Sequence, residues 1–213
     1  FPTFSILDPK TTFSLPANQV RNGIVDTFAH VIEQYIHDYT GAPLMDRFAE
    51  GILQTLVEVA PKTLANMEDY ESRASFMWCA TMALNTLIAS GTTQDWATHM
   101  IGHELTAFYG PAHAETLAIV LPGVWRSQLE LKGPKLKQMG QRVFGVDGAE
   151  ATIDAVEAFF HSLGMPTHLS DYGIDAEEAA GKVEARFAER GTMLGENQQV
   201  SPAMVADIIR SRA

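Results

Sequence analysis

Apolar residues recur every three or four positions along most of the chain, which is the spacing of one buried helical face. Pro61 is expected to break the second predicted helix, at about residues 41–59, and Pro122 is expected to kink or end the fifth, which begins near residue 112. The third helix is apolar on nearly every side, so we expect it at the centre of the core. The pattern predicts helices at about residues 18–37, 41–59, 72–90, 95–109, 112–122, 134–144, 149–163, 175–190 and 202–212.

Residues 1–16 lack this periodicity. Pro9 and Pro16 disfavour helix just ahead of them, and no convincing pair of strands follows. The prediction is an all-α domain over residues 17–213, preceded by an interdomain segment at 1–16. A weaker boundary is expected at 165–175, where a loop separates the last two predicted helices from the rest of the domain. The first residue is Phe rather than Met, so we interpret the chain as a fragment, or as a domain of a longer protein.

Composition narrows the class of protein. With 213 residues and 46 % hydrophobic content, the chain can bury a sizeable core. Its net charge of −11 argues against a nucleic-acid partner, because an acidic surface repels phosphates. The basic stretch from Lys132 to Lys137 is too short to reverse this and is expected to form a solvated helix face. No apolar run approaches the ~18 residues of a membrane span, and no signal peptide is visible, so no membrane partner is expected.

Cys79 is the single cysteine of the chain. A single cysteine cannot form a disulfide within the chain, and this favours a reducing, cytoplasmic location. Because Cys79 lies in a strongly apolar helical run, we expect a buried structural thiol rather than a nucleophile.

Two groups of residues indicate a metal site. Asp26 and His30 are four apart, so one helical face carries both. His99 and His103 share a second face, and a Gly-Pro turn can bring His113 back towards it. One carboxylate with several imidazoles suits a divalent transition metal. Pairs at this spacing also arise by chance, so ordinary helical histidines remain an alternative at this point.

The other candidate residues are expected to have structural roles. Glu104 and Glu115 are adjacent to or two residues from a histidine, which turns them away from its face. His37, His161 and His168 are interpreted as ordinary core or surface residues. A metal phosphohydrolase of the HD type would need a His-Asp dipeptide among its ligands, and His37–Asp38 is the only such pair.

The motifs together resemble a known family. The D-x3-H pair inside NGIVDTFAHVIEQY is followed about seventy residues later by H-x3-H-x9-H-[GA]. With ILDPKTTFSLP, THLSDYGID and LGENQQVSPAMVADIIRSRA, this pattern resembles the iron-containing (group III) alcohol dehydrogenases over essentially the whole chain. It looks closest to the NADPH-dependent aldehyde reductase and butanol dehydrogenase branch. The family often has glycine after the last histidine, where this chain has Ala114, also a small residue.

The resemblance implies the fold and the site. Family members have a dehydroquinate synthase-like fold, with an α/β nucleotide-binding domain and an all-helical metal domain. This sequence contains neither a GGGS loop nor G-x-G-x-x-G, so it corresponds to the helical domain, with the N-terminal domain absent. His103 would lie near nicotinamide and substrate as a proton relay, and Leu15 would touch the nucleotide. The implied metal ligands are Asp26, His30, His99 and His113.

The resemblance also implies a reaction. A divalent metal, Fe²⁺ or Zn²⁺, would polarise the oxygen of a small aldehyde or alcohol during hydride transfer with NADP(H) or NAD(H). Trp96, Phe108 and Tyr109 flank the histidine helix; core packing is the favoured interpretation of each, with the lining of an apolar substrate pocket as the alternative. A homodimer is expected. The first alternative is a non-catalytic metal-binding helical fragment. The HD-type phosphohydrolase is a less favoured second alternative.

Overall fold

The computed structural model describes residues 2–38 and 41–213. Its regular secondary structure is helical, and the β pairing found within these residues is one isolated bridge between Leu194 and Val200. The all-α prediction is confirmed. The α-helices are α1 (Ala17–Tyr35), α2 (Pro43–Ala65), α3 (Tyr70–Ala83), α4 (Ala97–Tyr109), α5 (His113–Ser127), α6 (Leu129–Met139), α7 (Ala149–Ser162), α8 (Ala176–Glu189) and α9 (Pro202–Arg210).

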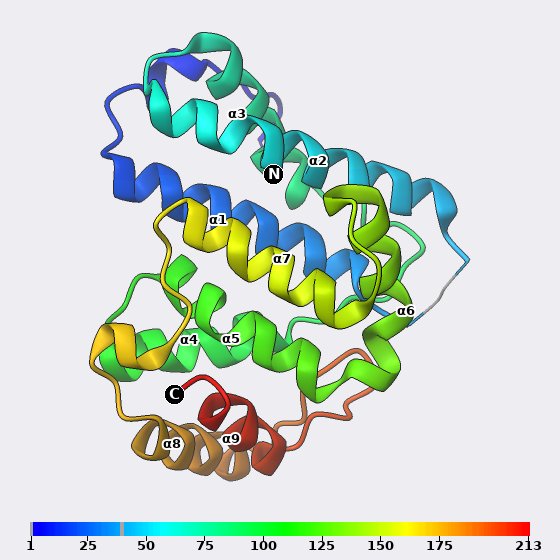
Figure 1. The fold of residues 1–213 in the computed structure, drawn as a ribbon, viewed down its shortest axis with the longest axis vertical. Helices are drawn as coiled ribbons and strands as arrows, with labels where there is room; N and C mark the ends of the chain where they lie inside the picture. Colours follow the sequence, from blue (N-terminus) through cyan, green and yellow to red (C-terminus); the bar gives the residue numbers. More distant parts are fainter. Residues whose placement is uncertain (1, 39–40) are drawn as a thin grey trace.

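Three short helical segments complete the chain. They are η1 (Pro9–Thr12), the π-helical η2 (Gly140–Phe144) and η3 (Leu169–Tyr172). Figure 1 shows α2 and α3 at one end of the molecule, α1 and α7 across the middle, and α8 and α9 at the other end. No helix among the described residues has the length and apolar character that crossing a membrane would require.

The helix α5 lies at the centre of the fold, and it joins two hydrophobic cores. Ala114, Ala118 and Leu121 face a core shared with α1, α2, α6 and α7. Ile119 and Val120 face a second core shared with α4, α8 and α9. Because every residue from 114 to 125 is buried, apart from the partly buried Glu115, α5 fills the central place that the sequence suggested for a different helix.

The prediction that the third apolar helix is central was wrong. It forms α3, which ends at Ala83 rather than near residue 90, and which lies at the edge of the molecule. Trp78 is 58 % exposed and Leu84, just after the helix, 56 % exposed. Composition alone misled here, because apolar side chains on every face of a helix show only that it could be buried. The thiol of Cys79 is buried, as predicted.

Prolines proved weaker helix breakers than expected. Pro61 lies inside α2, which continues to Ala65, and Pro122 lies inside α5, which continues to Ser127. A proline removes one backbone hydrogen bond, and packing on neighbouring helices can outweigh that local loss. Pro134 likewise lies within α6 rather than at its start. The start of α9 was predicted correctly, with the hydroxyl of Ser201 accepting from the Met204 amide.

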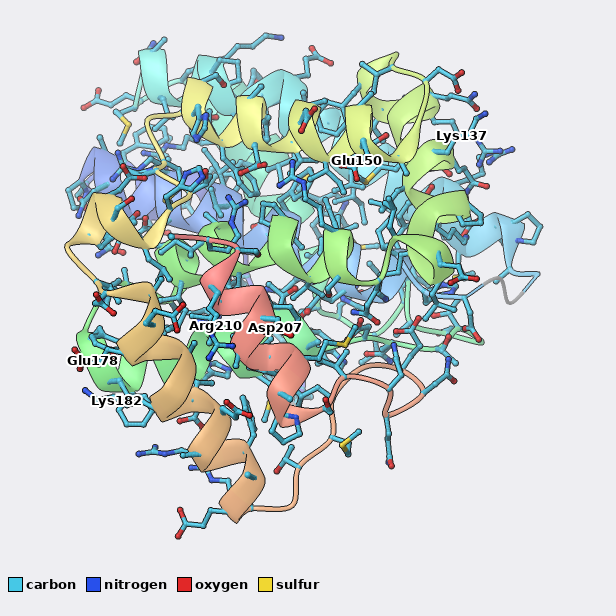
Figure 2. All side chains as sticks on the ribbon, turned by 60° about the horizontal axis from the view of Figure 1, so that its bottom comes forward. Lys137, Glu150, Glu178, Lys182, Asp207 and Arg210 are labelled. Carbon is cyan, nitrogen blue, oxygen red and sulfur yellow. The ribbon has the colours of Figure 1, made fainter. Side chains whose placement is uncertain are left out.

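The basic stretch on α6 was also misjudged. Lys132 and Lys135 are buried, with 1 % and 5 % of the side chain exposed, and each is paired with a carboxylate. The Lys132 Nζ lies 2.8 Å from Asp95 Oδ2, and the Lys135 Nζ lies 2.5 Å from Asp46 Oδ1. Lys137 alone among these three lysines behaves as predicted: it points outward at the edge of the molecule (Figure 2).

Glu157 on α7 ties the end of the chain to the bundle. Its carboxylate binds Arg126 Nη1 at 2.9 Å and also contacts the guanidinium of Arg212. Arg212 is itself buried and donates to the carbonyls of Ile119 and Thr167. Burial raises the pKa of Glu157, but the charges of Arg212 and Arg126 outweigh it and bring the pKa below its usual range.

Glu157→Gln is therefore expected to lower the free energy of unfolding by about 2 kcal/mol at pH 7, since a charged hydrogen-bonded carboxylate is lost. The folded-state pKa of Glu157 lies below the unfolded value of about 4.3. The stabilisation is thus fully present above pH ~5 and shrinks as the pH falls through the folded pKa. Urea unfolding at pH 7, 5 and 4 measures it. The matched control is Glu150→Gln on the exposed side of α7 (Figure 2), expected within ~0.5 kcal/mol of the parent; equal losses in both variants would contradict the assignment.

Candidate metal centre

The middle of α1 presents a carboxylate and an imidazole on one face. Asp26 and His30 lie one turn apart, and His30 Nδ1 is 3.2 Å from Asp26 Oδ1. The same Nδ1 is 2.8 Å from the backbone carbonyl of Asp26. Because a carbonyl oxygen can only accept, the hydrogen of His30 belongs on Nδ1. This leaves the Nε2 lone pair of His30 available to a metal.

Two further histidines come from α4 and α5. His99 lies in the first turn of α4, and His113 is the first residue of α5. Gly110 ends α4 with a φ of 86°, a left-handed conformation that glycine adopts easily and that reverses the chain. The predicted Gly-Pro turn is thus present and brings the starts of both helices to Asp26.

The three side chains converge on one point. Asp26 Oδ1 lies 3.9 Å from His99 Nε2 and 3.5 Å from His113 Nε2. One ligand atom from each of the three lies within 4.8 Å of the others. His30 is not in this convergent set, although the centroid of its ring is 4.4 Å from that of His99. The structure therefore brings three of the four predicted ligands together and places the fourth beside them.

Unsatisfied polar atoms show that the cluster suits a cation. Asp26 Oδ1 and His99 Nε2 are both buried and lack a hydrogen-bond partner within the described parts of the chain. A buried oxygen and a buried nitrogen with lone pairs facing each other are costly unless something positive lies between them. A carboxylate and imidazoles are ligands that Zn²⁺ and Fe²⁺ accept, so the residues present fit a divalent metal.

The protonation states also suit metal binding. Burial, helped by the charge of His30, lowers the pKa of His99 to about 4, so its imidazole is neutral at pH 7. Burial lowers the pKa of His113 as well. For Asp26, burial raises the pKa, but the adjacent imidazole of His30, 3.2 Å away, and the charges of His113 and His99 outweigh it, and the net shift is downward. Asp26 thus offers an ionised carboxylate, and His99 and His113 offer neutral imidazoles. For His30, burial lowers the pKa, but the hydrogen bonds and charge of Asp26 outweigh it and the net shift is upward, so a metal would displace a proton from this imidazole.

Sequence analysis missed one residue that contacts this cluster. Glu33, on α1, is 3 % exposed, and its Oε2 contacts Nδ1 of His99. Its other oxygen, Oε1, accepts from the backbone amide of Thr98 at 2.7 Å. A signal was present: Glu33 stands seven residues after Asp26 and three after His30, on the same helical face. Burial and the charge of Asp95 raise the pKa of Glu33 well above its usual range.

Aromatic rings surround the cluster unevenly. The exposed ring of His103 stacks on that of His113, with centroids 4.7 Å apart and planes 8° from parallel. Trp96 lies against His99, with centroids 5.2 Å apart. Phe108 and Tyr109 instead pack on the second core. Of the three aromatic residues suggested as pocket lining, Trp96 is therefore the one that lies beside the histidines.

A cavity of about 260 Å³ opens beside the metal cluster. Asn22, Asp26 and His113 are among the residues that line it, together with Gln19 from the first turn of α1. Leu15, the residue expected to touch a nucleotide, lies just ahead of α1 and is 42 % exposed. The cluster is thus within reach of a small molecule.

The remaining candidates have structural partners, as expected. Glu104 pairs with Arg186 at 3.0 Å and with Arg190. Glu115 accepts from the Ala112 amide and caps α5. Two further histidines also lie outside the convergent set: His37, whose Nδ1 contacts the carbonyl of the next residue, and His161, which bonds Thr167. The only His-Asp dipeptide of the sequence is therefore not part of the cluster found among the described residues.

The helical bundle, with this cluster at the junction of α1, α4 and α5, has the architecture of the C-terminal domain of iron-type alcohol dehydrogenases. Residues 21–213 match the model of the Fe-containing alcohol dehydrogenase family, C-terminal. The chain belongs to this family, and what it contains is the C-terminal helical domain.

Relatives and solved structures agree. The NADPH-dependent aldehyde reductase YqhD of Escherichia coli is 49 % identical over 207 residues, which is 94 % of this chain and 53 % of YqhD. The probable NADH-dependent butanol dehydrogenase 1 of Bacillus subtilis is 42 % identical over 84 % of this chain and 48 % of its own length. A substrate- and cofactor-free structure of YqhD from E. coli superposes with a TM-score of 0.97 and 46 % identity, covering all of this chain and 58 % of YqhD. The chain thus spans about half the length of the curated relatives it matches.

Proposed function

We propose that this chain is the metal- and substrate-binding half of an alcohol dehydrogenase or aldehyde reductase that uses NADP(H) or NAD(H). The observation that carries the proposal is the convergence of Asp26 Oδ1 with Nε2 of His99 and His113. His30 is the fourth ligand in this proposal, because the Asp26 carbonyl holds its Nδ1, which leaves the Nε2 lone pair for a metal. The names of the relatives, which include NADPH- and NADH-dependent enzymes, support this class of reaction.

A bound divalent metal would supply Lewis-acid chemistry, by polarising the oxygen of a small aldehyde or alcohol. Asp26 and the three histidines would hold it with a residual charge of about +1, which favours a developing alkoxide. His103, exposed and stacked on His113, would exchange a proton between the substrate oxygen and solvent. Trp96 would shield the ligand histidines from water on one side.

A bound nicotinamide would supply the hydride, and holding it would need more than the described residues offer. Leu15 is the single residue of this chain that we assign to the nucleotide, and its exposure is compatible with that contact. The remaining contacts would come from a nucleotide-binding half like the part of the relatives that this chain does not match. A homodimer and a cytoplasmic location stay predictions.

Elemental analysis of the purified chain tests the metal site. We expect about one Fe or Zn per chain, and a loss of it in His113→Ala. The matched control is His161→Ala, which should keep the metal. His161 is exposed and bonds Thr167 outside the cluster. Metal-free parent protein after loading with Fe²⁺ or Zn²⁺, or equal metal in both variants, would contradict the assignment.

A second assay tests the redox chemistry. The chain by itself is expected to bind metal but not to oxidise NADPH with an aldehyde, which is also the result that the non-catalytic alternative predicts. Joining it to the N-terminal half of E. coli YqhD separates the two, because a folded, metal-loaded fusion should reduce aldehydes and lose that activity in His113→Ala. An inactive fusion that carries the metal would favour the non-catalytic alternative.

A further inference from the structure

A buried carboxylate that lies behind His99 links the metal cluster to the start of α4. Glu33 Oε1 accepts from the amide of Thr98 at 2.7 Å and from that of His99 at 3.4 Å. Its Oε2 contacts Nδ1 of the His99 imidazole. One side chain of α1 therefore serves both the backbone and the side chain of a residue on α4.

The backbone contacts provide a helix cap. The first amides of a helix have no partner inside the helix, and an oxygen acceptor usually satisfies them. The N-cap residue of α4, Trp96, makes no such side-chain bond. Glu33 supplies the missing acceptor from a different helix, while Asp95 Oδ1 accepts from the Ala97 amide at 2.8 Å.

The side-chain contact fixes the imidazole. A neutral histidine carries its hydrogen on one ring nitrogen and a lone pair on the other. With Nδ1–H donated to Glu33, the lone pair of His99 belongs on Nε2. This Nε2 lies 3.9 Å from Asp26 Oδ1 and has no hydrogen-bond partner within the described residues.

We infer that Glu33 is a positioning residue of the metal centre: its carboxylate holds His99 in the tautomer whose Nε2 lone pair faces Asp26, and it locks the start of α4 onto α1. The inference rests on the proposed function, in that this lone pair is the one a metal would use. Carboxylate partners of this kind orient ligand imidazoles and raise their basicity, and removing them lowers metal affinity about 10–100-fold.

The substitution Glu33→Gln separates the two roles. Glutamine has one acceptor oxygen where glutamate has two. Backbone amides can only donate, so that oxygen must stay on Thr98 and His99 to keep the cap. The amide –NH₂ then faces Nδ1 of His99 and can only donate to it. The imidazole must accept at Nδ1 and carry its hydrogen on Nε2, which removes the lone pair from the metal.

Zn²⁺ competition titrations on the chain, with Asp95→Asn as the matched control, test this. Asp95 is a second buried carboxylate that caps the same helix start, but its side chain accepts from the Ala97 amide rather than from His99. We expect Zn²⁺ affinity to fall at least tenfold in Glu33→Gln and less than threefold in Asp95→Asn. An affinity of Glu33→Gln within threefold of the parent, or equal losses in both variants, would overturn the inference.

The ¹⁵N shifts of His99 in metal-free protein give a readout that is independent of zinc. Followed from pH 7 to pH 10, the parent should show hydrogen on Nδ1, and Glu33→Gln should show it on Nε2. A parent with hydrogen on Nε2 throughout overturns the inference even where the variant fails to fold. A parent that binds no zinc yet shows hydrogen on Nδ1, with a switch in the variant, tells against the proposed function and supports the positioning role.

Discussion

Asp26→Asn is expected to remove most of the stabilisation that a divalent metal gives this chain. A metal present at about 1,000 times its Kd stabilises a protein by roughly 4 kcal/mol. For a domain of this size, that raises the Tm by about 8–16 °C. Losing the single carboxylate ligand is expected to weaken binding about 100-fold, since an amide oxygen brings no charge to the ion. The same concentration of metal then adds only about 1.4 kcal/mol.

Thermal unfolding with and without Zn²⁺ measures this difference directly. The matched control is Asp207→Asn on α9, an exposed carboxylate that pairs with Arg210 and does not belong to the metal cluster (Figure 2). It should keep the full metal-induced gain in Tm. An equal gain in Asp26→Asn and in the parent would show that the metal binds elsewhere. An unchanged Tm in the parent would contradict the assignment of the metal site.

Helical periodicity predicted most of the fold, for a physical reason. Where one face of a helix is buried, apolar residues must repeat every three or four positions, and α1, α4, α7 and α8 lie close to their predicted ranges. Composition predicted burial less well. The nearly all-apolar α3 lies at the edge with Trp78 exposed, whereas α5, with Arg126 and Glu115 near its ends, fills the centre. Whether a face meets another helix depends on tertiary contacts that no local pattern contains.

The candidate site was predictable where spacing determined geometry. Asp26 and His30 are one turn apart on any helix, and the turn at Gly110 returns the chain to His99. Glu33 was not identified, because its partner His99 is 66 residues away and only the crossing of α1 and α4 brings them together. The motif could predict which residues lie at or beside the cluster, but not what holds them in place.

The buried lysine shows most clearly what packing adds to sequence. Lys132 belongs to a basic stretch that reads as a solvated face, yet its Nζ lies 3.0 Å from the Ile36 carbonyl and 2.9 Å from Glu196 Oε2, besides its contact with Asp95. It therefore ties the end of α1, the start of α4 and the loop after α8 to α6. The amide of Asp95 in turn donates to the Glu33 carbonyl, which joins this lysine to the scaffold of the metal cluster.

Lys132→Met is expected to lower the free energy of unfolding by about 3–5 kcal/mol, because it leaves two carboxylates buried without their cation. That corresponds to a fall in Tm of roughly 6–20 °C. Lys137→Met, with 54 % of the lysine side chain exposed, removes the same charge from the same helix and should cost less than ~0.5 kcal/mol. The triple variant with Asp95→Asn and Glu196→Gln should regain part of the loss, since no buried charge is then left unpaired. Urea or thermal unfolding measures both variants. Similar losses in the free energy of unfolding for Lys132→Met and Lys137→Met would contradict the prediction, because they would show that the two buried carboxylates do not need the charge of Lys132.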